Sequence, residues 1–143
     1  MNTTATRIVL DTNVLIAIIG KKSPFRWIFD AIIDGKLILC VSTSILLEYR
    51  EVLARKNGFA VAENILNFLA VHPFVEHYEI YFAMKIIPND PDDDKFVDCA
   101  FASGSILITN DGHFEVLRLI DFPEIAFLNL QEFEIWANEN AIF

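Results

Sequence analysis

Residues 7–19, RIVLDTNVLIAII, contain the pattern that sets the fold of this chain. The first four residues, RIVL, form a short run rich in β-branched residues that ends at Asp11, which is typical of a strand. The residues from Thr12 to Ile19 then show helical spacing and stop before Gly20, a residue suited to end a helix. The stretch therefore predicts a strand that passes directly into a helix.

The same strand-and-helix unit recurs along the 143 residues. We expect further strands at residues 36–41, 105–109 and 124–130, and further helices at residues 24–33, 45–56, 60–72, 94–103, 113–120 and 131–140. Ser23 is the expected N-cap of the second helix, with Pro24 at its first position. The segment at residues 77–84, HYEIYFAM, fits a strand or a helix equally.

The expected strands are mainly apolar rather than alternating, which indicates burial on both faces. Strands of this kind, alternating with helices, predict an α/β fold around a parallel sheet. The length is that of one domain, so we expect residues 1–143 to form a single unit.

Composition narrows the functional classes. The formal net charge of −9 argues against a nonspecific nucleic-acid coat, but metal ions could cancel a local acid cluster, so a nuclease remains open. The longest apolar run, Val14 to Ile19, is far short of the ~20 residues that span a bilayer, and we expect no membrane association. No targeting segment is visible, so the expected location is cytoplasmic.

Acidic residues fall where strands of the predicted sheet end. Asp11 follows the first strand, Asp111 follows the strand at residues 105–109, and Glu48 lies in the second turn of the helix after the second strand. Residues 89–98, NDPDDDKFVD, hold five aspartates and run into the helix that feeds the Asp111 strand. The functional crevice of an open parallel sheet lies outside these strand ends, so four segments should bring acids to one rim.

A cluster of carboxylates predicts bound cations. Two like charges 4 Å apart repel by about 4 kcal/mol at an effective dielectric constant of 20. Mg²⁺ and Mn²⁺ prefer oxygen ligands and leave room for substrate phosphate. Two such ions about 4 Å apart can activate a water and stabilise the leaving oxygen of a phosphodiester. The pattern therefore indicates metal-dependent phosphoryl chemistry.

Each acid also has a plainer interpretation. The NDPDDD run is typical of a solvated turn, Asp11 could cap its helix, Glu48 could be a surface glutamate, and Asp111 could be a turn residue. A calcium-binding loop counted from Asp90 fails, because its sixth residue is Lys95 and its twelfth is Phe101. The functional interpretation depends on the four acids occurring together.

Four stretches in this order resemble the PIN domain. They are LDTNVL at residues 10–15, the glutamate of the third expected helix, DPDDDKFVDCA at residues 90–100 and ILITNDGHF at residues 106–114. Within that family the chain is similar to the VapC-like bacterial toxins of toxin–antitoxin systems, from about Arg7 to Leu130. The resemblance implies a three-layer α/β/α fold, RNA cleavage that depends on Mg²⁺ or Mn²⁺, a cognate antitoxin and a homodimer.

The resemblance also implies a set of site residues. The catalytic and metal-binding acids would be Asp11, Glu48, Asp111 and an aspartate of the 92–94 run, with Asn13 and Thr109 as supporting polar groups. Asp93 matches the recurrent family position, whereas helix register favours Asp94 together with Asp98, one turn later. Asp93 and Asp94 rank level, and Asp98 is a further metal ligand or a support.

Two rival functions remain open at this level. A haloacid-dehalogenase-type phosphotransferase also places an aspartate after its first strand, but two positions later it normally has a second aspartate where this chain has Asn13. A PIN-fold module that only binds a partner would keep the fold without the chemistry. Phe25 and Trp27 could stack on a base, although aromatic residues in such a helix more often pack in a core.

Overall fold

The strands form one sheet with every neighbouring pair parallel. The computed structural model of the chain describes residues 5–81, 94–112, 114 and 125–142. The strands are β1 (Thr6–Leu10), β2 (Leu37–Val41), β3 (Val75–His77), β4 (Ile106–Ile108) and β5 (Phe127–Leu128). They lie in the order β3-β2-β1-β4-β5, so the N-terminal strand is the central one. The predicted parallel sheet is confirmed.

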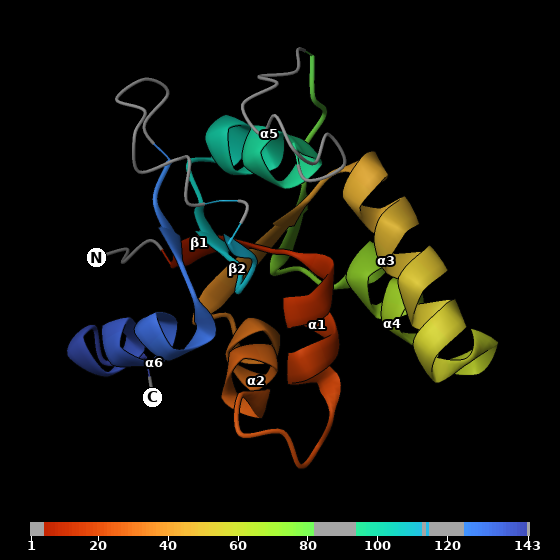
Figure 1. Cartoon of the computed structure of the whole chain (residues 1–143), viewed down its shortest axis with the longest axis horizontal. Coiled ribbons are helices and arrows are strands. Elements are labelled where there is room, and N and C mark those ends of the chain that lie inside the picture. The colour runs from red at the N-terminus through yellow and green to blue at the C-terminus, as the bar shows by residue number, and fades with distance from the viewer. Residues whose placement is uncertain (1–4, 82–93, 113, 115–124, 143) are drawn as a thin grey trace.

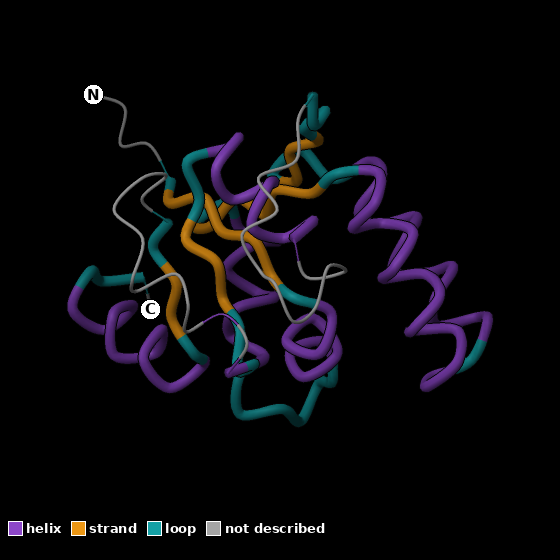
Figure 2. Tube along the Cα trace, turned by 45° about the horizontal axis from the view of Figure 1, so that its top comes forward, coloured by secondary structure: helices purple, strands orange, loops and turns teal. Residues whose placement is uncertain are grey.

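Helices cover both faces of this sheet. They are α1 (Thr12–Ile19), α2 (Arg26–Asp34), α3 (Thr43–Asn57), α4 (Phe59–Val71), α5 (Asp94–Ser103) and α6 (Leu130–Glu139). In Figure 1, α5 lies on one side of the strands and α1, α2 and α6 lie on the other, with the α3–α4 pair beside α1. Figure 2 shows the strands gathered in the middle of the helices. The predicted three-layer α/β/α architecture is confirmed.

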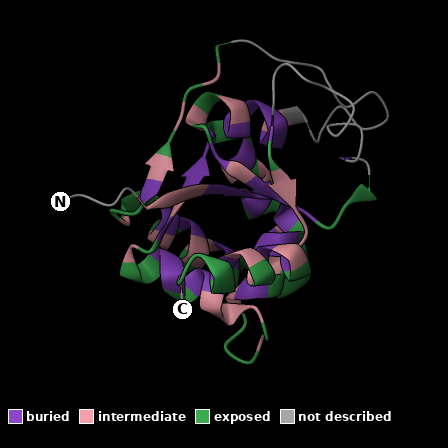
Figure 3. Ribbon diagram, turned by 90° about the vertical axis from the view of Figure 1, so that its left-hand side faces the viewer, coloured by how far each residue is buried: buried purple, intermediate pink, exposed green. Residues whose placement is uncertain are grey.

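The core lies between the sheet and the inner faces of the helices. Ile8, Val9 and Leu10 of β1 are fully buried, as expected for a central strand. In Figure 3 buried and intermediate colours make up most of the strands, while the exposed colour lies mainly on the outer sides of the helices and on loops. Burying this apolar surface is the main stabilising contribution to the fold.

Several element boundaries differ from the sequence prediction. The second helix begins at Arg26 rather than at Pro24. Ser23 does not cap it, because the Ser23 hydroxyl donates to the Ala17 carbonyl at 2.5 Å and accepts the Phe25 N–H at 3.1 Å, which holds the chain in a turn instead.

The later part of the chain shows other differences. The open segment at residues 77–84 only overlaps the end of β3, whose strand character comes from pairing with β2, and its remainder from residue 82 lies outside the described residues. The helix expected at residues 113–120 also falls almost wholly outside them. The last strand is shorter than expected because Asn129 already caps α6. Across the described ranges, no helix has the length and apolar character that would cross a membrane.

Candidate active site

Asp11 lies at the carboxyl end of the central strand and is held on both carboxylate oxygens. Its Oδ1 accepts the Val14 N–H at 2.9 Å, so Asp11 is the N-cap of α1. Its Oδ2 accepts a hydrogen bond from the hydroxyl of Thr109, which follows the neighbouring strand β4. The residue is only 7% exposed. The capping interpretation is therefore correct, and the cap also leaves a fixed carboxylate at the rim of the sheet.

The environment of Asp11 disfavours its charge. Burial is the largest cause and raises the pKa of the Asp11 carboxyl above its usual value, while the hydrogen bonds from Thr109 and Val14 lower it. The negative charges of Asp111 and Glu48 raise the same pKa further. The structure thus brings Asp111 and Glu48, which come from two other segments, within electrostatic reach of Asp11.

Glu48 is held in place from two other elements. Its Oε2 accepts a hydrogen bond from the Thr12 hydroxyl at the start of α1, and its Oε1 lies 2.7 Å from the Nζ of Lys95 on α5. The side chain of Glu48 is 24% exposed and that of Lys95 is 22% exposed. The next residue, Tyr49, donates its buried hydroxyl to the Leu10 carbonyl at 2.5 Å, which fixes α3 against the end of β1.

Sequence reasoning did not assign Thr12 or Lys95 to the site. Each directly follows a candidate acid in the sequence, Thr12 after Asp11 and Lys95 after the triple-aspartate run. A basic residue inside an acidic run is a weak signal that it balances a carboxylate nearby. The partner of that lysine, Glu48, could not be identified without the tertiary structure.

The remaining candidates are placed as follows. Thr109 is buried, and its Oγ1 accepts the Asp111 N–H at 3.0 Å while the hydroxyl donates to Asp11. Asn13 is exposed, and its Oδ1 accepts a hydrogen bond from Lys56 at 3.4 Å. Asp98 is buried on α5. Asp93 lies outside the described residues, as does the side chain of Asp94, so the choice between these two stays open.

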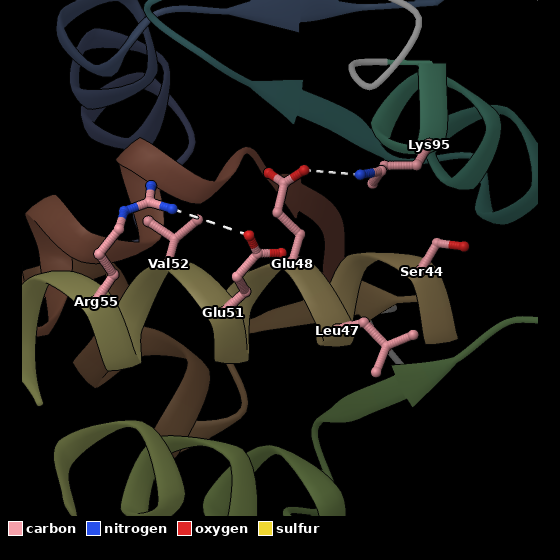
Figure 4. A pocket seen from close by; sticks show the side chains of 7 residues that line it. All are labelled: Ser44, Leu47, Glu48, Glu51, Val52, Arg55 and Lys95. Carbon is pink, nitrogen blue, oxygen red and sulfur yellow. Dashed lines mark hydrogen bonds and ion pairs between the residues drawn. The ribbon is translucent and has the colours of Figure 1, made fainter. Parts of the chain in front are cut away.

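A groove of about 490 Å³ borders Glu48 along α3. Figure 4 shows Lys95 reaching from α5 to Glu48, and Arg55 pairing with Glu51 one turn further along α3, where Arg55 Nη1 and Glu51 Oε1 are 3.9 Å apart. The groove is lined by Ser44, Leu47, Glu48, Glu51, Val52, Arg55 and Lys95. The groove therefore carries two carboxylates, Glu48 and Glu51, each beside a basic side chain, and it is open to solvent.

The donors at the rim suit a hard divalent cation in their chemistry. Carboxylate and hydroxyl oxygens are the ligands that Mg²⁺ and Mn²⁺ prefer, and a cation would relieve the like-charge repulsion that acts on Asp11. Among the described residues, however, no three acidic, histidine or cysteine side chains lie close enough together to hold an ion. Glu48 is instead balanced by Lys95.

The fold and this arrangement of acids define the class of protein. Residues 7–113 match the PIN domain family, and the chain belongs to that family. The matched range contains every candidate acid identified above. No curated protein matches the sequence significantly.

Solved structures with the same fold are distant in sequence. VapBC2 from Rickettsia felis, solved with a DNA fragment from its promoter, is 14% identical, with a TM-score of 0.61 over 87% of this chain and 98% of that one. DNA-bound VapBC from Salmonella typhimurium is 18% identical, with a TM-score of 0.58 over 87% and 98% of the two chains. The PIN domain endonuclease Utp24 is 20% identical, with a TM-score of 0.55 over 89% and 86%.

Proposed function

We propose that the chain is a metal-dependent endoribonuclease that hydrolyses RNA phosphodiester bonds and acts as the toxin of a type II toxin–antitoxin pair. The observation that carries this proposal is the fixed, buried carboxylate of Asp11 at the end of the central strand, with Glu48 and Asp111 near enough to raise its pKa. Membership of the PIN domain family supports the same conclusion.

The acids would hold Mg²⁺ or Mn²⁺. Asp11, Glu48, Asp111 and one of Asp93 and Asp94 are the proposed ligands, with Asp98 as a further ligand or a support. When bound, an ion of this kind supplies Lewis acidity, which polarises a phosphodiester and lowers the pKa of a water molecule.

The other residues position these acids. The Thr109 hydroxyl fixes the Asp11 carboxylate, and the same oxygen holds the backbone of Asp111, so one residue sets the spacing of two acids. Thr12 orients Glu48 in the same way. Lys95 balances the charge of Glu48, which limits the repulsion among the acids while the site holds no cation.

An antitoxin and a second copy of the chain are the proposed protein partners. The structural similarity to VapBC assemblies, two of them bound to DNA, supports a cognate antitoxin. The endonuclease Utp24 shares the same fold and supports the nuclease part of the proposal.

An RNA cleavage assay tests the enzyme. The purified chain should cut a labelled single-stranded RNA in Mg²⁺ or Mn²⁺ and should stop in excess EDTA. Asp11→Asn should lower the rate by more than about 100-fold, because even residues that only support a metal ligand are typically worth 10–100-fold. Asp34→Asn is the matched control, since Asp34 is an exposed aspartate at the end of α2, and it should cleave at the wild-type rate.

Other outcomes of this assay identify the alternatives. Cleavage that persists in EDTA or in Asp11→Asn contradicts the proposed site. Cleavage of DNA but not RNA contradicts the substrate. Hydrolysis of a phosphate monoester in place of RNA indicates a phosphotransferase, and a folded chain that cleaves nothing with either metal is a binding module.

A further inference from the structure

A second pocket lies at the same edge of the sheet, beyond the ends of β4 and β5. It has a volume of about 370 Å³ and is lined by Phe25, Asn110, Asn129, Leu130 and Gln131. This volume lies within the range of about 300–1,000 Å³ that is usual for small-ligand sites. Asn110 stands between Thr109 and Asp111 in the sequence, so the pocket begins one residue from the candidate active site.

Two asparagine side chains in the pocket have fixed orientations. The Oδ1 of Asn110 accepts the Leu130 N–H at 3.0 Å, and the Oδ1 of Asn129 accepts the Glu132 N–H at 2.8 Å. A backbone N–H can only donate, so these contacts decide which end of each amide faces the protein. The Nδ2 group of each residue is therefore left as a donor, and among the described residues neither Nδ2 has a hydrogen-bond partner.

The rest of the lining is suited to a flat ring. Phe25 is half-buried and lies in the turn before α2, while Leu130 provides an apolar wall at the start of α6. Single-stranded RNA is commonly recognised by a base that stacks on an aromatic side chain and forms hydrogen bonds along its edge. An aromatic residue beside two fixed amide donors has the components of such a site.

We propose that this pocket binds one base of the RNA next to the cleaved phosphate, and that it prefers guanine or uracil. On the edge that faces the major groove of a duplex, guanine presents two acceptors, O6 and N7, and uracil presents the acceptor O4, whereas adenine and cytosine carry an exocyclic amino donor there. The two fixed Nδ2 donors can bond the acceptors of guanine and uracil, whereas in adenine and cytosine they meet an amino donor. This inference rests on the proposed RNA substrate and adds the choice of base.

Binding without cleavage tests the base preference. Fluorescence anisotropy in EDTA would compare two labelled RNA hexamers, one of alternating guanine and uracil and one of alternating adenine and cytosine. Both hexamers carry the same number of phosphates, so the ratio of their dissociation constants cancels the general effect of charge. We expect the first to bind roughly tenfold more tightly, as one matched pair of hydrogen bonds contributes about that factor.

Two conservative variants remove the donors. Asn110→Asp and Asn129→Asp each keep an oxygen acceptor for the same backbone N–H and replace the Nδ2 donor by a second acceptor. Each should bring the affinity ratio close to one while thermal unfolding stays near that of the wild type. Asn64→Asp, which makes the same charge change at an exposed position on α4, should leave the ratio unchanged.

A third variant tests whether Phe25 stacks on the base. Phe25→Leu should weaken both hexamers by a similar factor, because stacking is tolerant of base identity. Equal affinity of the wild type for both hexamers, or an unchanged ratio in Asn110→Asp and Asn129→Asp, would overturn the pocket. If the chain shows the base preference but never cleaves RNA, the pocket is supported and the proposed nuclease is contradicted. If the chain cleaves RNA but shows no base preference, the nuclease is supported and the pocket is contradicted.

Discussion

At the scale of single residues, Asp11 combines a structural contact with an energetic cost. Its carboxylate caps α1 and accepts from Thr109, and both contacts favour the charged form. Burial and the charges of Asp111 and Glu48 disfavour the charged form, and the net effect raises the pKa of the Asp11 carboxyl. A residue whose charge is disfavoured in the folded state lowers the stability of the protein wherever it is ionised.

Asp11→Asn should therefore make the protein more stable at neutral pH. The amide keeps Oδ1 as the acceptor for Val14 and turns Nδ2 toward the Thr109 oxygen, while the charge is removed. We expect the free energy of unfolding at pH 7 to rise, because the substitution removes a charge that burial and two neighbouring acids disfavour. Urea denaturation measures this difference. The control Asp34→Asn should change the free energy of unfolding little, because Asp34 is exposed.

The pH dependence gives the sign of the effect. The folded pKa lies above the ordinary value of 3.8, so the cost of ionised Asp11 is fully present above the folded pKa and disappears as the pH falls toward 3.8. The stability advantage of Asp11→Asn should shrink accordingly between pH 7 and about pH 4. A variant that is less stable than the wild type at pH 7 would contradict this explanation.

At the scale of elements, contacts at the ends of strands and helices hold neighbouring elements together. The Tyr49 hydroxyl joins α3 to the end of β1. The Arg7 guanidinium of β1 binds Glu76 of β3 through two hydrogen bonds of 2.7 and 3.2 Å that cross the intervening strand β2. Gly35 ends α2 with a φ of 81°, and its N–H donates back to the helix, so the chain can turn directly into β2.

Gly35→Ala should destabilise this junction. Its positive φ disfavours any residue with a Cβ, and an added Cβ would lie 2.7 Å from the ring of Phe74. We expect a loss of about 1–2 kcal/mol in the free energy of unfolding, because the left-handed conformation alone costs about that amount. Gly20→Ala is the matched control, since Gly20 has a φ of −69° and open space around it. Equal melting temperatures of the two variants would contradict the explanation.

At the scale of the whole molecule, the sheet order gathers charge at one edge. The chain has a formal net charge of −9, and β1, β4 and α3 bring Asp11, Asp111 and Glu48 to the same rim. Acids that repel one another in the free protein bind a cation more tightly than isolated acids do. Ion binding to the folded state should therefore appear as added stability.

Mn²⁺ should raise the melting temperature of the wild type. A ligand at 100 times its dissociation constant stabilises the folded state by about 2.7 kcal/mol. Differential scanning fluorimetry with and without MnCl₂ measures this, with NaCl at matched ionic strength as the control for screening. Asp11→Asn should lose most of the Mn²⁺ shift, and a shift of equal size in that variant would place the ion elsewhere.

Much of the fold follows from local sequence patterns. The strand ending at Leu10, the helix from Thr12 to Ile19 and the helix from Asp94 to Ser103 were all predicted from the periodicity of apolar residues and from capping residues. The parallel arrangement of the strands follows from their apolar character, because strands buried on both faces are typical of parallel sheets. Two of the residues that the resemblance implies lie at the ends of these elements: Asp11 directly follows the first strand, and Asp94 begins the last of these helices.

The sequence by itself thus determined the α/β class, the PIN domain family and the set of candidate acids, because each rests on short patterns of a few residues whose order along the chain can be read directly. Only the tertiary structure decided how the acids are held: Asp11 by Thr109, 98 positions away, and Glu48 by Lys95, 47 positions away. It also decided that Val75–His77 is a strand and that Asn110, which lines a pocket, accepts the Leu130 N–H with its Oδ1. Such contacts depend on the order of the strands in the sheet, which no local periodicity specifies.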